Sequence, residues 1–278
     1  MTISILGCGW LGFPLAKQLV QKGYRIKGST TRTEKIEQLR QHNIEPFLIQ
    51  LTPKPTGEGW EEFLKADILV INIPPRLEKV GANFHLDQMR ALKKWLDQMP
   101  IERVMYVSST SVYPELSRVV VEEEVQTPEQ SATPALVMAE QIVQTLADSW
   151  LVLRCGGLMG YERIPAKYVS GKKNLTTGDI PVNYIHRDDA IAVIDAFLDK
   201  KHLWNDTYNV VAPLHPSRRE VYIASAQPFG FEIPTFQEAD AQLFKIISSQ
   251  KLQQSLHFTF KFPDPLGFLY GLSSDLNP

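Results

Sequence analysis

The segment Gly7-Cys8-Gly9-Trp10-Leu11-Gly12 has the pattern G-x-G-x-x-G and decides the fold that we expect for this chain. It follows a short apolar run, 3–6, and opens a helical pattern over 11–21 that Gly23 ends. In this context the pattern indicates a dinucleotide-binding loop: the first glycine permits the tight turn, the second lets backbone approach a diphosphate, and the third lets helix pack on strand. We therefore predict that Gly7, Gly9, Trp10, Leu11 and Gly12 hold a diphosphate at the free N–H groups of the helix start. Trp10 is expected to pack rather than to stack on a base.

The rest of the chain continues the alternation of strand and helix. Apolar runs predict strands at 3–6, 24–28, 46–51, 68–73, 103–107 and 150–153, with helices at 11–21, 33–41, 84–98 and 135–147 between them. Such alternation predicts right-handed βαβ units and an α/β, Rossmann-type, doubly wound parallel sheet. We expect residues 1–158 to form this dinucleotide-binding core, with 182–212 returning to it. The segments 159–181 and 213–278 are rich in Pro and less regular, and they predict a smaller α+β substrate lobe.

The end of the second predicted strand indicates which dinucleotide is bound. NAD-binding chains place a carboxylate here to accept hydrogen bonds from the ribose hydroxyls. This chain has Ser29, Thr30, Thr31 and Arg32 instead, and no carboxylate before Glu34, which has capping-box spacing from Thr31. Hydroxyls and a guanidinium bind a 2′-phosphate through charge-assisted hydrogen bonds, whereas a carboxylate would repel it. The sequence therefore predicts NADP(H) in preference to NAD(H), while a helix cap at Thr31 and a solvated Arg32 would explain the same residues.

Further cofactor contacts are expected where the other strands end, because ligands bind at the carboxyl ends of strands in this fold. Gln50 and Leu51, at the end of the third predicted strand, should flank the adenine. Asn72, Ile73 and Pro74, after the fourth, should line the path of the ribose and diphosphate. Four consecutive hydroxyl residues, from Ser108 to Ser111, follow the fifth strand and should line the nicotinamide side, with Ser108 as a cofactor contact.

Three motifs in this order resemble the extended short-chain dehydrogenase/reductase group, the NAD(P)-dependent epimerase/dehydratase family. They are the glycine loop, Ser108-Ser109-Thr110-Ser111-Val112-Tyr113, and Ile185-His186-Arg187-Asp188-Asp189-Ala190. The resemblance runs from Ile3 to the Phe262–Pro265 tail. It implies a Rossmann core, a bound nicotinamide nucleotide and a C-terminal substrate lobe, often for nucleotide-linked sugars. The glycine spacing departs from the G-x-x-G-x-x-G that is usual in extended members.

The same resemblance assigns a catalytic Ser or Thr, a Tyr and a Lys, the last two as Y-x-x-x-K on the helix before the sixth strand. The first position falls on Ser109. Matching the family's following Glu to Glu140 places Ala132 at the Tyr position and Leu136 at the Lys position, so the usual general acid and its supporting lysine are replaced. The chain is therefore identified as an atypical member. Tyr168 and Lys172 do spell Y-x-x-x-K, but they follow the sixth strand, and we interpret them as a chance match.

Ser109, Tyr113 and His186 are the remaining candidates for catalysis. Tyr113 could reach the cleft from the long connection 113–134, although its family counterpart is mostly structural. His186 matches a family motif at the mouth of the cleft, and Asp188 or Asp189 is expected to cap the helix that follows.

Composition and missing motifs argue against several other classes of protein. The 278 residues carry 29 basic and 31 acidic side chains, a net charge of −2, which argues against a nucleic-acid-binding protein. The two cysteines, Cys8 and Cys155, are too few for a disulfide framework and are interpreted as packed thiols. The sequence shows no secretory signal or membrane span, so we expect a cytoplasmic protein. Six scattered histidines predict no metal site, and the absence of G-x-S-x-G argues against a hydrolase with a Ser-His-Asp triad.

Two hypotheses from different classes follow. One is an NADP(H)-dependent oxidoreductase or epimerase with a non-standard acid/base, acting on a nucleotide-sugar or a small carbonyl compound. The other is a catalytically silent protein that senses NADP(H) and changes its contact with a partner. A third, suggested by the resemblance of 9–16 to β-hydroxyacid dehydrogenases, is disfavoured because no all-helical domain follows residue 160. The sequence allows a small-molecule substrate or none, and a monomer or a homodimer.

Overall fold

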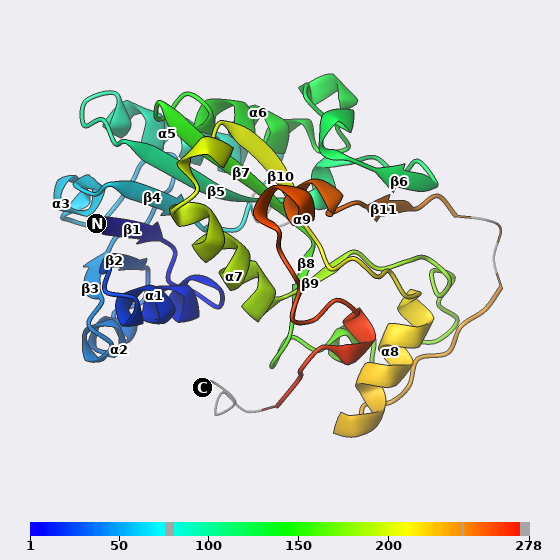
Figure 1. Ribbon diagram of the computed structural model, residues 1–278. Helices are drawn as coiled ribbons and strands as arrows, with labels where there is room; N and C mark the ends of the chain where they lie inside the picture. Colours follow the sequence, from blue (N-terminus) through cyan, green and yellow to red (C-terminus); the bar gives the residue numbers. More distant parts are fainter. Residues whose placement is uncertain (76–80, 239, 241, 273–278) are drawn as a thin grey trace. The chain divides into compact units, whose positions relative to one another are not determined.

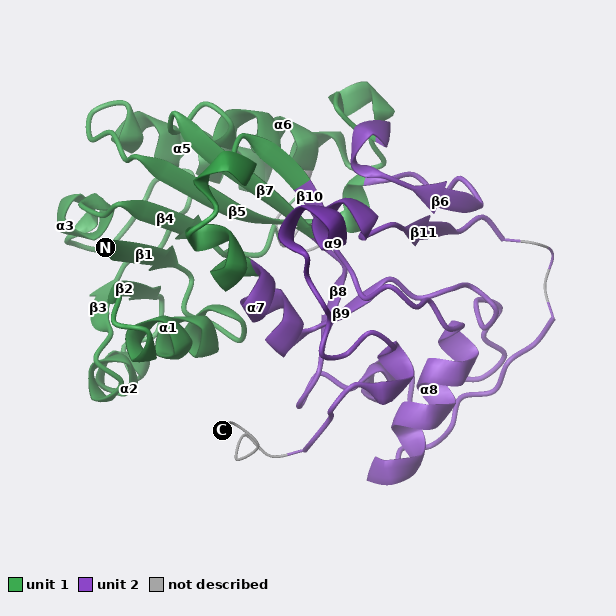
Figure 2. Cartoon of the chain, viewed as in Figure 1, with its two compact units in different colours: residues 1–112, 125–154, 194–207 green, residues 113–124, 155–193, 208–278 purple. Residues whose placement is uncertain are grey.

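The computed structural model describes residues 1–75, 81–238, 240 and 242–272 (Figure 1). The chain divides into two compact units (Figure 2). Unit 1 comprises residues 1–112, 125–154 and 194–207, and unit 2 comprises 113–124, 155–193 and 208–278. The predicted domains placed 113–124 and the whole of 182–212 with the core, whereas only 194–207 of the latter stretch groups with unit 1.

A seven-stranded sheet with the order β10-β7-β5-β4-β1-β2-β3 confirms the predicted fold class. Its strands are β1 (Thr2–Leu6), β2 (Arg25–Thr30), β3 (Glu45–Leu48), β4 (Ile68–Ile71), β5 (Arg103–Ser109), β7 (Ser149–Cys155) and β10 (Asp206–Val210). The pairs β1–β2, β2–β3, β1–β4 and β4–β5 are all parallel, with Ile3 opposite both Ile26 and Ile68. Strand order reverses between β1 and β4, so their carboxyl ends form the point where this fold binds ligands.

The central strands are mostly apolar and buried, as expected of strands that helices cover on both faces. Every residue of β4 is buried, and in β1 Ile3 and Ile5 have no exposed surface. Helix α1 (Gly12–Gln21) follows β1 and contacts α7 (Arg187–Leu198) through Gln18 and Asp195, 2.9 Å apart. Helices α5 (Ala82–Leu96) and α6 (Pro134–Val143) pack together on the other side of the sheet (Figure 1). This two-sided arrangement follows from right-handed crossovers that run in opposite directions along the sheet.

Two short helices complete the described helices of unit 1. Helix α2 (Lys35–Gln41) lies between β2 and β3, and its N-cap is Glu34. The capping box expected at Thr31 is therefore wrong, because the helix begins four residues later and no side chain caps it. Helix α3 (Trp60–Leu64) lies in the connection between β3 and β4, where no helix was predicted. Trp60 stacks on Trp95 of α5, with ring centroids 6.3 Å apart. With five residues, α3 is too short for its apolar side chains to show a helical period in the sequence.

Unit 2 contains the smaller lobe. Two parallel strand pairs, β6 (Arg118–Val120) with β11 (Lys245–Ile247) and β8 (Gly157–Met159) with β9 (Tyr184–His186), join segments far apart in sequence. Helices α8 (Arg218–Ala226) and α9 (Gln250–Leu256) complete it. Ser217 caps α8 by accepting a hydrogen bond from the Glu220 N–H. The mixture of short strands and helices agrees with the predicted α+β lobe.

Candidate functional site

The glycine turn between β1 and α1 lies at the switch point of the sheet, and two of its glycines are required by the packing of the protein itself. Gly7 has a φ of +108°, and a Cβ there would lie 2.4 Å from the carbonyl oxygen of Asn72. A Cβ at Gly12 would lie 2.2 Å from the carbonyl oxygen of Gly7. Both contacts are with backbone oxygens, so relieving either clash would require the main chain to move. Gly7 and Gly12 therefore fix the shape of the turn with or without a ligand.

Gly9 differs from both of these glycines. It is exposed, and a Cβ built on it would meet no atom of the described chain within 4 Å. Its φ also lies outside the region that strains other residues. Protein packing thus gives no reason for glycine at this position, whereas close approach of a ligand to the backbone does.

The start of α1 has the features expected of an anion-binding helix end. Leu11 is the N-cap residue, no side chain caps the helix, and its first turn has no acidic residue. The first N–H groups of a helix have no partner within the helix, and its dipole places partial positive charge at this end. The Phe13 N–H donates to the Gly9 carbonyl oxygen at 3.0 Å, so the donors expected beside the open space over Gly9 are those that precede Phe13.

Two predicted cofactor residues hold this turn in place. The Ser29 side chain, 2 % exposed, accepts a hydrogen bond from the Gly7 N–H at 2.8 Å, and its carbonyl accepts one from the Cys8 N–H at 2.8 Å. Asn72 Nδ2 donates to the Gly7 carbonyl oxygen at 3.0 Å. Both side chains thus tie the glycine turn to the ends of the neighbouring strands β2 and β4. The contacts assign them a positioning role here, while Ile73 and Pro74 follow β4 at the same edge.

The end of β2 exposes two of the four residues predicted to bind a 2′-phosphate. Thr30 is buried, and its hydroxyl accepts a hydrogen bond from the Arg32 N–H at 3.1 Å. The side chains of Thr31 and Arg32 are exposed, and no described residue forms an ion pair with Arg32. Residues 29–33 therefore expose one guanidinium, that of Arg32, and two threonine side chains, Thr31 and Thr33, and include no carboxylate.

Beyond β3, the predicted adenine residues lie in a short closed turn. Gln50 is exposed and forms two backbone hydrogen bonds of 3.0 Å with Thr56, one in each direction. Leu51 is 4 % exposed, and its carbonyl oxygen accepts a hydrogen bond of 2.6 Å from Gln88 Nε2 of α5. Sequence reasoning missed Gln88; its only sequence signal is a polar residue on the buried face of the long helix.

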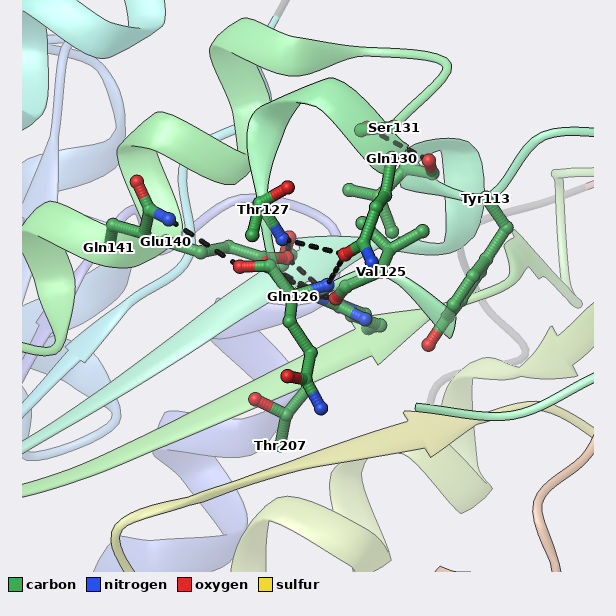
Figure 3. A network of polar contacts seen from close by, with 12 residues as sticks. Tyr113, Val125, Gln126, Thr127, Gln130, Ser131, Glu140, Gln141 and Thr207 are labelled. Carbon is green, nitrogen blue, oxygen red and sulfur yellow. Dashed lines mark hydrogen bonds and ion pairs between the residues drawn. The ribbon is translucent and has the colours of Figure 1, made fainter. Parts of the chain in front are cut away.

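At the end of β5, the two neighbouring serines have different surroundings. Ser108 is buried and donates to Glu140 of α6, and Glu140 forms an ion pair with Arg154 of β7 at 2.8 Å. Arg154 also donates to the Val125 carbonyl oxygen at 2.8 Å; Figure 3 shows this region, with Val125 and Glu140 labelled. Ser109 is half-buried, and its hydroxyl oxygen accepts the Ser111 N–H at 3.1 Å. No described residue accepts the Ser109 hydroxyl proton, so this proton is available to a ligand.

Helix α6 carries the positions that the family resemblance assigns to the Tyr-Lys pair. Ala132, just before the helix, is exposed and donates its N–H to the Val112 carbonyl oxygen at 2.9 Å. Leu136, in the first turn, is 1 % exposed. The helix sequence PALVMAEQIV contains neither tyrosine nor lysine. The replacement of the dyad stays a prediction, because it depends on how the family motif is aligned.

Tyr113 and His186 belong to unit 2, where both are fully buried. Tyr113 donates its hydroxyl proton to Asn209 Oδ1 at 2.7 Å, so proton transfer by this group would require that bond to break. His186 Nδ1 accepts the Asp188 N–H at 3.2 Å, which leaves Nε2 to donate to the Leu269 carbonyl oxygen at 3.3 Å. Burial, the largest effect, lowers the pKa of His186. His186 thus links β9 to the C-terminal segment.

The two aspartates after His186 are not helix caps, because α7 begins at Arg187 and both lie in its first turn. The Asp189 carboxylate accepts the N–H groups of Lys261 and Phe262 at 2.8 and 2.9 Å. Asp188 accepts the hydroxyl of Tyr161 at 2.9 Å. The motif therefore holds segments of unit 2 together. Tyr168, from the Y-x-x-x-K match, is 57 % exposed at the end of a short 3-10 turn.

Two kinds of site are not found in the part of the chain that the structure describes. No cluster of three or more His, Cys, Asp or Glu side chains there has an arrangement that could hold a metal ion. None of the helices in the same residues combines the length and hydrophobicity that a membrane crossing requires.

Comparison of the sequence with known proteins identifies a relative along almost the whole chain. The chain is 31 % identical to Protein YeeZ of Escherichia coli (strain K12) over 268 residues, which cover 95 % of this chain and 97 % of that protein. No family model matches the chain.

Solved structures share the fold at lower identity. A conserved protein of unknown function from Silicibacter pomeroyi superposes with a TM-score of 0.75 at 22 % identity, covering 100 % of this chain and 99 % of that one. The UDP-glucuronic acid 4-epimerase of Bacillus cereus, in complex with UDP-glucuronic acid and NAD, superposes with a TM-score of 0.75 at 15 % identity over 96 % of each chain. The chain therefore belongs to the family of Protein YeeZ, and it has the Rossmann-type fold of the short-chain dehydrogenase/reductase and epimerase structures.

Proposed function

We propose that this protein binds NADP(H) at the glycine turn of unit 1. The observation that carries the proposal is the open space over Gly9 beside the uncapped start of α1. A diphosphate needs a close approach to backbone and N–H donors at a helix start, and the open space over Gly9 beside the uncapped start of α1 meets these requirements. The B. cereus epimerase of the same fold holds NAD, which supports a nicotinamide dinucleotide as the class of ligand.

The preference for NADP(H) over NAD(H) is part of the proposal. Arg32 and Thr31 are exposed at the end of β2, where an NAD-binding chain of this fold has a carboxylate. Arg32 would bind the 2′-phosphate by charge-assisted hydrogen bonds, and Thr31 would add a neutral donor. Glu34 lies at the start of α2, two residues beyond Arg32.

For the chemistry, we propose an oxidoreductase or epimerase that acts on a nucleotide-sugar or a small carbonyl compound. The bound nicotinamide would supply or accept the hydride. Ser109 would donate its hydroxyl proton to a substrate oxygen, because the described protein provides no acceptor for it. The nucleotide-sugars held by structures such as MoeE5 with UDP-glucose and NAD, 16 % identical, support this substrate class.

A second candidate function is a catalytically silent protein that senses NADP(H). The specific observation in its favour is that α6 contains no tyrosine or lysine to serve as the usual proton donor and its support. Turnover of NADPH with any carbonyl or nucleotide-sugar substrate would contradict it. A change of oligomeric state between NADPH and NADP⁺, without turnover, would favour it.

The binding proposal is tested by Gly9→Ala with Gly267→Ala as the matched control. Both positions have open space around an added Cβ, so both variants should fold with the stability of the native chain. Titration with NADPH and NADH, followed by fluorescence and thermal shift, should show micromolar NADPH binding to the native chain and to Gly267→Ala. Binding to Gly9→Ala should be at least tenfold weaker. Equal binding to all three proteins, or binding of neither dinucleotide to the native chain, would contradict the proposal.

A further inference from the structure

A series of buried polar side chains connects the turn after β3 to strand β5 within unit 1. Its centre is His85 in the first part of α5, which is 1 % exposed. His85 Nδ1 lies 2.9 Å from Gln88 Oε1, and His85 Nε2 lies 2.6 Å from the hydroxyl of Tyr106 on β5. Gln88 Nε2 in turn donates to the Leu51 carbonyl oxygen at 2.6 Å. Three hydrogen bonds in series thus hold the backbone of Leu51 against the centre of the sheet.

The end of this series determines where each proton lies. The Leu51 carbonyl can only accept, so Gln88 must present its amide nitrogen to Leu51 and its oxygen to His85. Gln88 Oε1 can also only accept, so the proton of His85 must be on Nδ1. A neutral imidazole then has a free lone pair on Nε2, and this accepts the hydroxyl proton of Tyr106.

The burial of the series favours this neutral form. Burial lowers the pKa of His85, opposed by its hydrogen bond to Gln88, and no acidic group contributes to the shift. Tyr106 is fully buried, and burial raises its pKa well above the ordinary value, so it keeps its proton. Both rings are also nearly parallel, with centroids 5.9 Å apart. The orientation of His85 is therefore fixed by packing as well as by hydrogen bonds.

The far end of the series lies where the proposed cofactor would place its adenine. Leu51 follows β3 at the carboxyl edge of the sheet, and Gln50 beside it is held by its backbone bonds to Thr56. With Gln50 fixed by that turn, Leu51 is fixed from the interior by Gln88. A rigid wall raises affinity because less conformational freedom is lost when the ligand binds.

We propose that His85 is a positioning residue for the adenine half of the dinucleotide, which it serves as the neutral Nδ1–H tautomer by orienting Gln88 against Leu51. The inference rests on the proposed dinucleotide site. It names a residue that contacts no ligand and acts through two others. Neither the glycine motif nor the family resemblance points to it.

Three variants separate this role from a general loss of structure. His85→Phe keeps a ring and removes both hydrogen bonds. His85→Asn keeps an amide N–H near the position of Nδ1, which can still donate to Gln88. Gln88→Met removes the direct donor to Leu51 and keeps the length of the side chain. His202→Gln, an exposed histidine of the same unit, is the control.

The probes are NADPH and its adenine half, 2′-phospho-AMP, measured by calorimetry at pH 7.5. We expect His85→Phe and Gln88→Met to weaken both ligands by the same factor, about fivefold, which corresponds to one net hydrogen bond. His85→Asn should recover most of the loss, and His202→Gln should bind like the native chain. A general loosening of the unit would instead weaken NADPH more than its adenine half, because NADPH contacts both ends of the site.

The tautomer is measured independently of any ligand, on the native chain, by ¹⁵N NMR of the histidine side chains. A proton on Nδ1 with Nε2 unprotonated at pH 7.5 is the expected result, and a proton on Nε2 would overturn the inference. Native binding of 2′-phospho-AMP by His85→Phe and Gln88→Met would also overturn it and leave the proposed function standing. Failure of the native chain to bind either dinucleotide would remove the proposed function, and the adenine role with it, while the tautomer result would still stand.

Discussion

The side-chain nitrogen Nδ2 of Asn72 donates a hydrogen bond of 3.0 Å to the carbonyl oxygen of Gly7. This bond joins the ends of β4 and β1, the two neighbouring strands at which the strand order of the sheet reverses. The Asn72 side chain also occupies the space beside Gly12, because an added Cβ there would lie 2.8 Å from the same nitrogen. The turn that faces the proposed diphosphate is thus held rigid by its own strands before any ligand binds.

Gly12→Ala should destabilise the protein, because its Cβ would lie 2.2 Å from a backbone oxygen that cannot move freely. Overpacking of this kind costs about 1–3 kcal/mol. Urea unfolding should show the loss for Gly12→Ala and none for Gly9→Ala, whose Cβ would meet open space. Equal stability of the two variants would mean that the turn is not packed as described.

Arg32→Gln should reduce affinity for NADPH and leave affinity for NADH unchanged. A hydrogen bond to a charged group contributes about 1.5–3 kcal/mol, which corresponds to roughly a tenfold loss or more. Arg40→Gln, which changes an exposed arginine near the end of α2, is the control and should bind both dinucleotides normally. If the native chain prefers NADH, the role given to Thr31 and Arg32 is wrong.

Glu140→Gln should be among the most damaging single changes in unit 1. Glu140 and Arg154 are 2 % and 4 % exposed, so removing one charge leaves the other buried without its partner. Such a change costs about 3–5 kcal/mol. Glu37→Gln breaks an ion pair with Arg40 in which both side chains are more than 60 % exposed, and chemical unfolding should detect no loss there. A small effect of Glu140→Gln would indicate that water reaches this pair.

His85 should make stability depend on pH. Burial lowers the folded-state pKa of His85 below its ordinary 6.5, so the unfolded chain takes up the proton first. The stability that neutral His85 contributes is therefore full above pH 6.5 and is lost as pH falls through the folded-state pKa. Burial raises the pKa values of Glu122 and Asp189, which act in the opposite direction, so the measured quantity must be a difference. The gap in unfolding free energy between the native chain and His85→Asn should be larger at pH 7.5 than at pH 5.5; a constant gap would contradict this.

Cys8 and Cys155 should resist alkylation in the folded protein. Burial raises the pKa of each thiol to about 12, so almost no reactive thiolate exists at pH 8. Iodoacetamide at pH 8 should label both cysteines only after denaturant unfolds the chain. Rapid labelling of either thiol in the native protein, followed by mass spectrometry, would show that it is accessible.

The sequence predicted the architecture of unit 1 well because its signals are local. A window of about ten residues is enough to predict several of its elements. These are the apolar strands β1 and β4, the glycine turn, and the periodic helices α1 and α5. The predicted fold class, a Rossmann-type parallel sheet with a smaller α+β lobe, is confirmed, and the sheet has seven strands. Boundaries were less accurate: α2 begins after the predicted cap at Thr31, and α3 is too short to show a period.

The candidate site was predictable only as far as its residues carry a motif. Gly7, Gly9 and Gly12 could be predicted as site residues because the motif gives each glycine a different steric reason to be glycine. Only the folded chain shows that Gly7 and Gly12 are packed against backbone atoms, whereas the space beside Gly9 is open. Ser29 and Asn72 were predicted as ligand contacts, yet their side chains hold the turn. The sequence places a polar side chain at a strand end, but it does not show whether that side chain forms its hydrogen bond with a ligand or with the protein.

By itself, then, the sequence determined the class of fold and the glycine turn at which we propose that a diphosphate binds, because these depend on glycine, on apolar periodicity and on short-range order. Only the tertiary structure decided that Glu140 meets Arg154 and Ser108, or that Leu51 is tied to His85 through Gln88. Glu140 and Arg154 are separated by 14 residues, Ser108 and Glu140 by 32, and Leu51 and Gln88 by 37. No local pattern encodes such contacts, since they form only when packing of the sheet and its helices brings buried polar groups within reach of each other.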